Sequence, residues 1–266
     1  IFGFSILVLF NMMLAKIIGG KIVLTIHDVR SFANINSSKI YTKFIYALAN
    51  SVLTHNVFSK NEIIKHHQNL ESKISIVPHG NYLPFIKYNT DQFSARKKIN
   101  IDPNSKVILF FGMIKKVKRL DLLLEAMPEI IKGCDNVNLL IAGKPWKDDF
   151  STYQKIINDL KIHDNCTLHI KFIKSEDLKH YYSASDLIIL PYNKIYQSGV
   201  LMMSLSFCKA VVLSDLEAFK EVVEDKKSAL FFSSGDKNNL AEVIIGALKD
   251  NDLREKISEG GLDLMK

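Results

Sequence analysis

The segment DLIILPYNKIYQSGVLMMSLSFCKAVVLSD, residues 186–215, carries the strand, loop, helix and strand signals that decide the fold. Its two apolar runs, residues 186–192 and 209–213, are typical of buried parallel strands. The polar loop between them ends at Ser198, a typical helix N-cap residue, and an apolar helix is predicted over 200–207.

The polar loop of this segment is the first candidate site. Open α/β sheets bind ligands where a loop leaves the carboxyl end of a parallel strand. The free amides and positive dipole end of the following helix favour an anion there. We therefore predict a phosphate-bearing ligand over Gln197, Ser198 and Gly199. The same spacing also fits an ordinary strand-to-helix turn in which Ser198 only caps the helix.

Outward from this segment, strands and helices alternate in two series. The first has predicted strands over 21–27, 51–54 and 73–77, and helices over 38–49 and 59–67. The second adds strands over 106–112, 137–143, 166–173 and 229–232, and helices over 120–132, 152–160, 176–183, 217–223 and 237–248. This alternation predicts an α/β fold with two Rossmann-like, doubly wound parallel-sheet domains. Residues 81–105 lack a clear period, so we place the first domain at 1–97 and the second at 98–266.

Composition narrows the classes of partner. The chain has 266 residues, of which 47% are hydrophobic, and a formal net charge of +7. The positive excess consists of scattered lysines, which suits anionic ligands or an anionic membrane face. A nucleic-acid partner is not expected, because no compact basic motif with interleaved aromatic residues is present. The three cysteines have no metal-binding spacing, and we expect reduced core thiols.

Residues 1–15, IFGFSILVLFNMMLA, are the one candidate for membrane contact. As a helix they would span ~22 Å, which is less than the ~30 Å hydrocarbon core of a bilayer. We expect a buried or partly membrane-facing helix, with true insertion as the alternative. The chain does not begin with Met, and we expect it to be a fragment.

Histidines follow the three predicted strands of the first series. His27, His55 and His79 each lie in a loop directly after a strand, and the carboxyl ends of parallel strands share one edge of a sheet. His27 follows the most apolar strand and is our candidate for a chemical role. Two of the three fit equally well as residues that only stabilise their loops.

A basic loop follows the first strand of the second series. Gly112 permits a close backbone turn, and Lys115, Lys116, Lys118 and Arg119 precede a predicted helix. Cations at a helix N-terminus are unfavourable unless an anion lies among them, although a solvated basic loop is the simpler alternative. Neither a Walker loop nor a dinucleotide fingerprint is present. No GxSxG motif or paired carboxylates occur, which favours catalysis by positioning and by stabilising a leaving diphosphate.

The order of these motifs resembles the family-4, retaining, sugar-nucleotide glycosyltransferases. The resemblance covers roughly residues 20–250, and its motifs are FFG…Lys118…DLLLEAM, NLLIAGKP, KFIKSEDLKHYYSASDLIILPY, YQSGVL and KAVVLSD…FKEVVED…GD. It implies the GT-B fold, in which two Rossmann-like domains face a cleft. TIHD and IVPHGN resemble the acceptor-side domain, whose first strands and glycine-rich loop are missing here, so that domain is expected to be incomplete.

The resemblance also implies residue roles. His27 matches the family histidine near the donor sugar, and Lys118 matches the lysine that holds the donor diphosphate. Gly112 matches the glycine that opens the same loop. Ser198 and Gly199 match the turn whose amides reach the phosphates.

Four positions depart from the family pattern. Met113 replaces the usual arginine, and Arg119 replaces a usual glycine, so Arg119 could supply part of the lost charge. The Glu-x7-Glu pair falls on Tyr196 and Ser204, which removes both carboxylates. A QSGV turn in place of that pair also resembles a subgroup of the family.

The resemblance implies a bacterial, metal-independent hexosyltransferase of the cell envelope. It would move a sugar with retention from a UDP- or GDP-linked donor to a glycan or lipid-linked acceptor in polysaccharide biosynthesis, with no cofactor. Its expected location is cytoplasmic, at the inner face of the plasma membrane if the first helix binds lipid. The lost carboxylates equally fit an inactive partner or scaffold that binds nucleotide or glycan. A sugar-nucleotide epimerase of the same fold would need several cleft carboxylates, which are not found.

Overall fold

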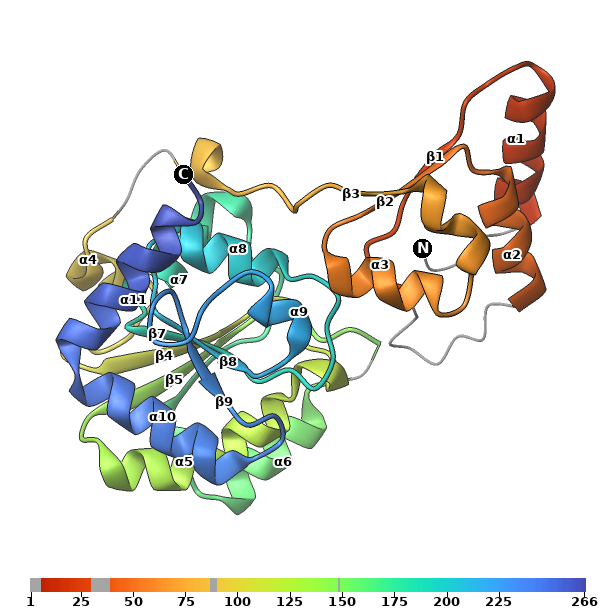
Figure 1. Ribbon diagram of the computed structural model, residues 1–266. Helices are drawn as coiled ribbons and strands as arrows, with labels where there is room; N and C mark the ends of the chain where they lie inside the picture. Colours follow the sequence, from red (N-terminus) through yellow and green to blue (C-terminus); the bar gives the residue numbers. More distant parts are fainter. Residues whose placement is uncertain (1–5, 30–38, 87–89, 148) are drawn as a thin grey trace. The chain divides into compact units, whose positions relative to one another are not determined.

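The computed structural model describes residues 6–29, 39–86, 90–147 and 149–266, which form two units. Unit 1 comprises the chain up to His79 together with residues 195–197, and unit 2 comprises residues 80–194 and 198–266. Residues 80–97, assigned to the first domain from sequence, therefore lie in unit 2. Figure 1 labels the helices and strands of both units.

Unit 1 contains a three-stranded parallel sheet in the order β1-β2-β3. Its elements are α1 (Ile6–Ile17), β1 (Val23–Thr25), α2 (Lys39–Leu48), β2 (Ser51–Thr54), α3 (Val57–Ile64) and β3 (Ile74–Ile76). A small core that includes Ile26, Tyr46, Val52 and Ile63 packs between these elements. Because all three strands are parallel, the loops that begin at their carboxyl ends lie at one edge, as the sequence predicted.

Unit 2 contains a six-stranded, wholly parallel sheet in the order β6-β5-β4-β7-β8-β9. The strands are β4 (Lys106–Phe111), β5 (Val137–Ala142), β6 (Cys166–His169), β7 (Leu187–Leu190), β8 (Val211–Ser214) and β9 (Leu230–Phe232). The strand order reverses between β4 and β7, which is the doubly wound arrangement. Central strands such as β7 are buried along their whole length, which explains their unbroken apolar sequence.

Helices cover both faces of this sheet, as Figure 1 shows. They are α4 (Gln92–Lys98), α5 (Leu120–Gly133), α6 (Ser151–Asp159), α7 (Leu178–Ala184), α8 (Gly199–Ser206), α9 (Glu217–Lys220), α10 (Lys237–Lys249) and α11 (Asn251–Asp263). One face is covered by α5, α6 and α10, and the other by α4, α7, α8 and α11. The predicted α/β class with parallel sheets is therefore confirmed, and the sheet of unit 2 is doubly wound.

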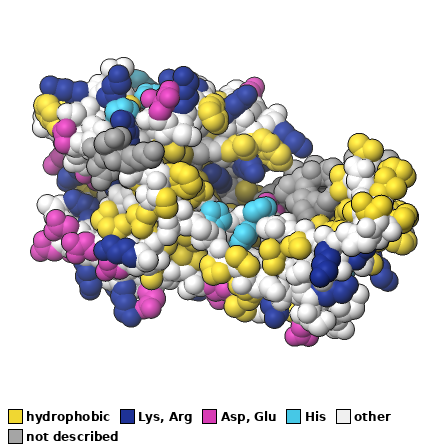
Figure 2. All heavy atoms as spheres, turned by 90° about the horizontal axis from the view of Figure 1, so that it is seen from above, with side chains coloured by type: hydrophobic (Ala, Val, Ile, Leu, Met, Phe, Trp, Pro, Cys, Tyr) yellow, Lys and Arg dark blue, Asp and Glu magenta, His cyan; other side chains and the backbone are white. Residues whose placement is uncertain are grey.

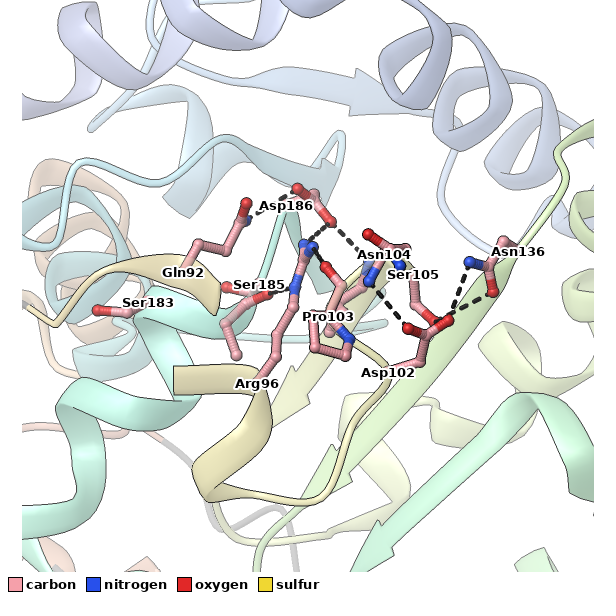
Figure 3. Close-up of polar contacts among 12 residues, drawn as sticks. Gln92, Arg96, Asp102, Pro103, Asn104, Ser105, Asn136, Ser183, Ser185 and Asp186 are labelled. Atoms are coloured by element: carbon pink, nitrogen blue, oxygen red, sulfur yellow. Dashed lines mark hydrogen bonds and ion pairs between the residues drawn. The ribbon is translucent and has the colours of Figure 1, made fainter. Parts of the chain in front are cut away.

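A buried ion pair joins α4 to the amino end of the sheet (Figure 3). The Arg96 guanidinium lies 2.6 Å from an Asp186 carboxylate oxygen, and its other nitrogens donate to the carbonyls of Ala184 and Pro103. The same Asp186 oxygen accepts the backbone N–H of Val107 in β4 at 2.6 Å. The charge of Arg96 is thus neutralised and its donors are used, which a buried cation requires. This pair explains why α4 belongs to unit 2.

Three local predictions need correction. No helix was predicted over residues 81–105, which lack a clear period, but α4 forms there, with the Asp91 side chain accepting from the Ser94 N–H as its N-cap. Helix α11 follows α10 directly and was not predicted; Asp250 caps it through the Leu253 N–H. The segment 166–173 is a strand only as far as His169.

Helix α1 exposes most of its apolar side chains, so it is not the buried helix of the prediction, and the partly membrane-facing helix stays a prediction. Leu7, Phe10 and Ile17 are more than half exposed, and Met12 is buried. Figure 2 shows hydrophobic side chains gathered at the end of unit 1 that holds α1. Residues 1–5 of the predicted segment lie outside the described residues. Within the part of the chain that the structure describes, no helix is long and apolar enough to cross a membrane.

Candidate functional site

The loop after β4 turns at Gly112, whose backbone has φ +92°. This conformation favours glycine because it lies in the left-handed region. Space is also limited: a Cβ on Gly112 would lie 3.2 Å from Lys118 Nζ and 3.3 Å from Val200 Cγ2. Gly112 therefore brings the Lys118 ammonium and the first turn of α8 to within contact distance of the same point. We call Gly112, Lys118, Ser198 and Gly199 the candidate anion site, all within unit 2.

Lys118 is the charged residue of this site, and its pKa differs strongly from that of an ordinary lysine. Burial of its ammonium, followed by the positive charge of Lys115, lowers the pKa of Lys118 to about 7. Its Nζ lies 5.3 Å from the centroid of the Tyr192 ring and 3.5 Å from the Phe111 carbonyl oxygen. The structure gives it no carboxylate partner among the described residues. An ammonium held in this way would gain free energy from a bound anion.

Ser198 caps α8, as the sequence predicted. Its side-chain oxygen accepts the Leu201 N–H at 3.2 Å, and its backbone is extended, as is usual for an N-cap residue. The first turn of a helix has amides without intrahelical acceptors, and its dipole end is positive. The N-terminus of α8 and Lys118 thus present positive charge to the space beside Gly112.

Trp146 borders the same loop and was missed from sequence. Its backbone N–H donates to the Ile114 carbonyl, and the Ile114 backbone N–H donates to the Lys144 carbonyl, both at 3.0 Å. Lys115 Nζ lies 4.6 Å from the Trp146 ring centroid, and Lys147 Nζ lies 4.8 Å from it. The available signal was the chain's single tryptophan, placed shortly after the carboxyl end of a strand.

Unit 1 brings His27, His55 and His79 together. The rings of His27 and His55 are stacked with centroids 4.9 Å apart, and those of His55 and His79 are 5.7 Å apart. Gln197 Nε2 lies 2.9 Å from His27 Nδ1. Burial, followed by the neighbouring His55, lowers the pKa of His27. The predicted site residues therefore form two groups, with His27 and Gln197 in unit 1 and the candidate anion site in unit 2.

The sequence pattern named "Glycosyl transferases group 1" matches residues 91–263 of the chain. The chain belongs to this family. The match spans almost all of unit 2, including every member of the candidate anion site.

Individual relatives of this group 1 glycosyltransferase are distant in sequence. The chain is 22% identical over 226 residues to N-acetyl-alpha-D-glucosaminyl L-malate synthase of Bacillus anthracis, covering 85% of the chain and 54% of the relative. It is 28% identical over 161 residues to lipopolysaccharide 1,2-N-acetylglucosaminetransferase of Salmonella typhimurium, covering 59% and 39%. The chain thus spans about half or less of the length of the curated relatives it matches.

Solved structures share the fold of this group 1 glycosyltransferase. Anabaena HepE in complex with UDP and glucose superposes with a TM-score of 0.84 at 16% identity, over 96% of this chain and 69% of HepE. WaaG, a glycosyltransferase of lipopolysaccharide biosynthesis, superposes with a TM-score of 0.75 at 17% identity, over 91% and 70%. These similarities establish the GT-B α/β fold.

The positions that depart from the resemblance have local explanations. Arg119 adopts a left-handed backbone with φ +51°, the conformation that glycine would favour, and its Nε donates to Asp121 at 2.9 Å. Met113 is about half exposed. Tyr196 and Ser204 are fully buried, and the Ser204 hydroxyl donates to the Val200 carbonyl at 2.7 Å. A carboxylate at either buried position would need a charged or hydrogen-bonding partner.

In the described part of the chain, no group of three or more His, Cys, Asp or Glu side chains is arranged to hold a metal ion. The cysteines in this part are free thiols; Cys134 is buried, and Cys166 and Cys208 are partly buried.

Proposed function

We propose that the protein is a retaining hexosyltransferase that uses a nucleoside-diphosphate sugar, UDP- or GDP-linked. The observation that carries the proposal is the meeting of Lys118, Gly112 and the N-terminus of α8 at one point. A diphosphate accumulates negative charge as it leaves the sugar. Positive groups fixed before the reaction stabilise that charge without reorganisation.

Each part of the candidate anion site has a distinct task. The Lys118 ammonium supplies the full positive charge, and the first-turn amides of α8 donate hydrogen bonds to phosphate oxygens. Gly112 has no side chain, so a diphosphate can reach both the Lys118 ammonium and the first-turn amides of α8. His27 is assigned to the donor sugar by the family resemblance, and Gln197, which contacts His27 within unit 1, shares that role in this proposal.

Arg119 contributes less in this proposal than the sequence suggested. Its Nε is engaged by Asp121, and the ion pair offsets its charge. Lys115 and Lys147, which flank Trp146, are better candidates for the charge that Met113 does not supply.

The acceptor, location and cofactor remain part of the proposal. A cell-surface glycan or lipid-linked acceptor is supported by relatives such as phosphatidyl-myo-inositol mannosyltransferase of Mycobacterium leprae, to which the chain is 24% identical over 184 residues. A cytoplasmic location at the inner face of the plasma membrane is supported by the exposed apolar side chains of α1. No nucleic acid, metal or cofactor enters the proposed reaction.

A second candidate is an inactive partner or scaffold that binds nucleotide or glycan without turnover. The burial of Tyr196 and Ser204 favours it, since both carboxylates of the family pattern are replaced by residues packed inside the protein. This candidate shares the anion site with the first and differs only in lacking transfer.

Titration of the chain with UDP and GDP tests the shared step, with the fluorescence of Trp146 as the readout because it is the only tryptophan. A ligand at a hundredfold excess over its Kd should also stabilise the folded state by about 2.7 kcal/mol in a thermal-shift assay. Lys118→Met should abolish the response, whereas Lys220→Met, an exposed lysine of α9, should leave it unchanged. Binding of neither nucleotide would contradict the transferase and leave only a scaffold that binds glycan. If a nucleotide binds, an assay for sugar release or transfer from the corresponding sugar nucleotide would distinguish an enzyme from a scaffold.

A further inference from the structure

The three-histidine cluster of unit 1 contains a hydrogen-bond chain that ends on the Val77 carbonyl. His55 Nδ1 lies 2.9 Å from the Val77 carbonyl oxygen, and His55 Nε2 lies 3.0 Å from His27 Nδ1. The two rings are also stacked, with an interplanar angle of 29°. His27 Nδ1 faces His55 Nε2, and the protonation of that nitrogen depends on the bond that His55 Nδ1 makes with the Val77 carbonyl.

The Val77 carbonyl fixes the proton of His55. A carbonyl oxygen only accepts, so His55 Nδ1 must carry the hydrogen that joins them. A neutral imidazole has one N–H, which leaves His55 Nε2 with a lone pair. An acceptor 3.0 Å from His27 Nδ1 requires a hydrogen on that nitrogen.

We propose that His55 is a positioning residue that holds neutral His27 in the tautomer with its proton on Nδ1. The Nε2 atom of His27 then presents a lone pair and accepts a hydrogen bond from a hydroxyl group. This inference deepens the proposed function and rests on it for the identity of that hydroxyl as one of the sugar substrates. It assigns His55 a task that its place in the sequence did not reveal.

The Gln197 amide is compatible with the same tautomer but does not fix it, because it can turn either its oxygen or its nitrogen to His27. Gln197 Nε2 is the amide atom placed 2.9 Å from His27 Nδ1, while Gln197 Oε1 is buried without a hydrogen-bond partner among the described residues. Oxygen and nitrogen of an amide exchange places by a half-turn about the last side-chain bond. With the oxygen toward His27, it accepts from Nδ1–H together with His55 Nε2, in a three-centre bond. The same tautomer thus gives the Gln197 oxygen a partner.

The environment keeps His27 in the neutral form that the tautomer describes. Burial is the largest cause that lowers its pKa, and a positive charge on His55 or His79 would lower it further, while Asp28 raises it. With its lone pair on Nε2, neutral His27 accepts a hydrogen bond from a hydroxyl group and orients it. The hydrogen bonds from Val77 to His55 and from His55 to His27 fix the orientation of the His27 ring.

The tautomer can be observed directly by ¹⁵N NMR of the full chain labelled at its eight histidines. Long-range ¹H–¹⁵N correlation separates protonated from unprotonated ring nitrogens, and His27→Gln identifies the His27 signals by their loss. At pH 7.5, His27 should show a protonated Nδ1 and an unprotonated Nε2. A protonated Nε2 would overturn the proposal, whatever the protein's activity.

Two substitutions at His55 separate its contacts. His55→Asn can keep the bond to the Val77 carbonyl but cannot reach His27, and His55→Gln can place an amide oxygen near the former Nε2. We expect His55→Asn to shift His27 toward the other tautomer and His55→Gln to restore the original one. An unchanged tautomer in His55→Asn would also overturn the proposal. His163→Phe, at an exposed histidine of unit 2, is the matched control and should change neither.

Activity provides the second readout. If the proposed sugar transfer holds, His55→Asn should lower kcat about tenfold or more, as for loss of an oriented proton acceptor, while His55→Gln recovers part of it. A wild-type kcat in His55→Asn would overturn the positioning role. If no transfer is found for the wild type, the proposed function fails, and the NMR result still decides the tautomer.

Discussion

Gly143 packs directly against Gly112: a Cβ built on Gly143 would lie 1.9 Å from the Gly112 carbonyl oxygen. Gly143 also has φ +154°, where other residues are strained. The end of β5 therefore fixes the position of the loop that carries Lys118. We expect Gly143→Ala to lower the free energy of unfolding by at least about 2 kcal/mol, through steric overlap and backbone strain.

Urea denaturation followed by circular dichroism measures this change. The matched control is Gly246→Ala in α10, where nothing lies within 4 Å of the added Cβ. That substitution should stabilise the protein by about 0.5–1 kcal/mol, because alanine favours a helix more than glycine does. A Gly143→Ala protein as stable as wild type would contradict the close packing of the two loops.

If the proposed transfer holds, Lys118→Met should reduce it at least tenfold. The substitution keeps most of the side-chain volume and removes only the charge, whose loss from the transition state costs about 2–4 kcal/mol by analogy with oxyanion donors. Steady-state kinetics should show the effect in kcat/KM. Lys116→Met, an exposed lysine on the same loop, is the control, and unchanged turnover in Lys118→Met would exclude this lysine from the reaction.

Lys118 should also make the stability of the free protein depend on pH. Its pKa is lowered to about 7 in the folded state from an ordinary value of 10.5. Between these values the unfolded chain binds the proton and the folded chain does not, so the free energy of unfolding should rise as pH increases from about 7 toward 10. Below pH 7 both states are protonated and this contribution becomes constant.

Denaturation of the wild type and of Lys118→Met across pH 6–10 isolates the contribution of Lys118 to the free energy of unfolding. The difference between the two curves should be flat below about pH 7 and change above it. A difference that stays constant over the whole range would show that Lys118 keeps an ordinary pKa.

Arg96→Met should destabilise unit 2 by about 3–5 kcal/mol, because it leaves the Asp186 carboxylate poorly compensated in a largely buried place. The partner oxygen would retain the Val107 N–H but lose the guanidinium. Adding Asp186→Asn to Arg96→Met should recover part of the loss. The exposed pair of Lys220 and Glu217 serves as the comparison, and Lys220→Met should cost less than about 1 kcal/mol.

The exposed face of α1 should bind membranes. We expect the chain to co-sediment with vesicles containing anionic lipid, and the double variant Phe10→Ser and Leu14→Ser to lose most of this binding. Phe93→Ser, at a half-exposed phenylalanine of unit 2, is the control. Equal sedimentation of wild type and the α1 variant would exclude this helix as the lipid contact.

Several features of the protein follow from its sequence because they depend on neighbouring residues. The apolar runs at 187–190 and 211–214, the Ser198 cap and the turn at Gly112 are all local, and each occurs where the pattern predicts it. The Asp91 cap that starts α4 is an equally local feature, although no helix was predicted there.

Other features were decided only by tertiary structure. The contacts of His55 with His27, of Lys115 with Trp146 and of Arg96 with Asp186 join residues 28, 31 and 90 positions apart. Which strands become neighbours determines these contacts, and the alternation of strands and helices does not encode that order. The sequence therefore determined the class of fold and the positively charged N-terminus of α8. The strand order decided which distant side chains become neighbours, because hydrophobic periodicity specifies the buried face of an element but not the element that packs against it.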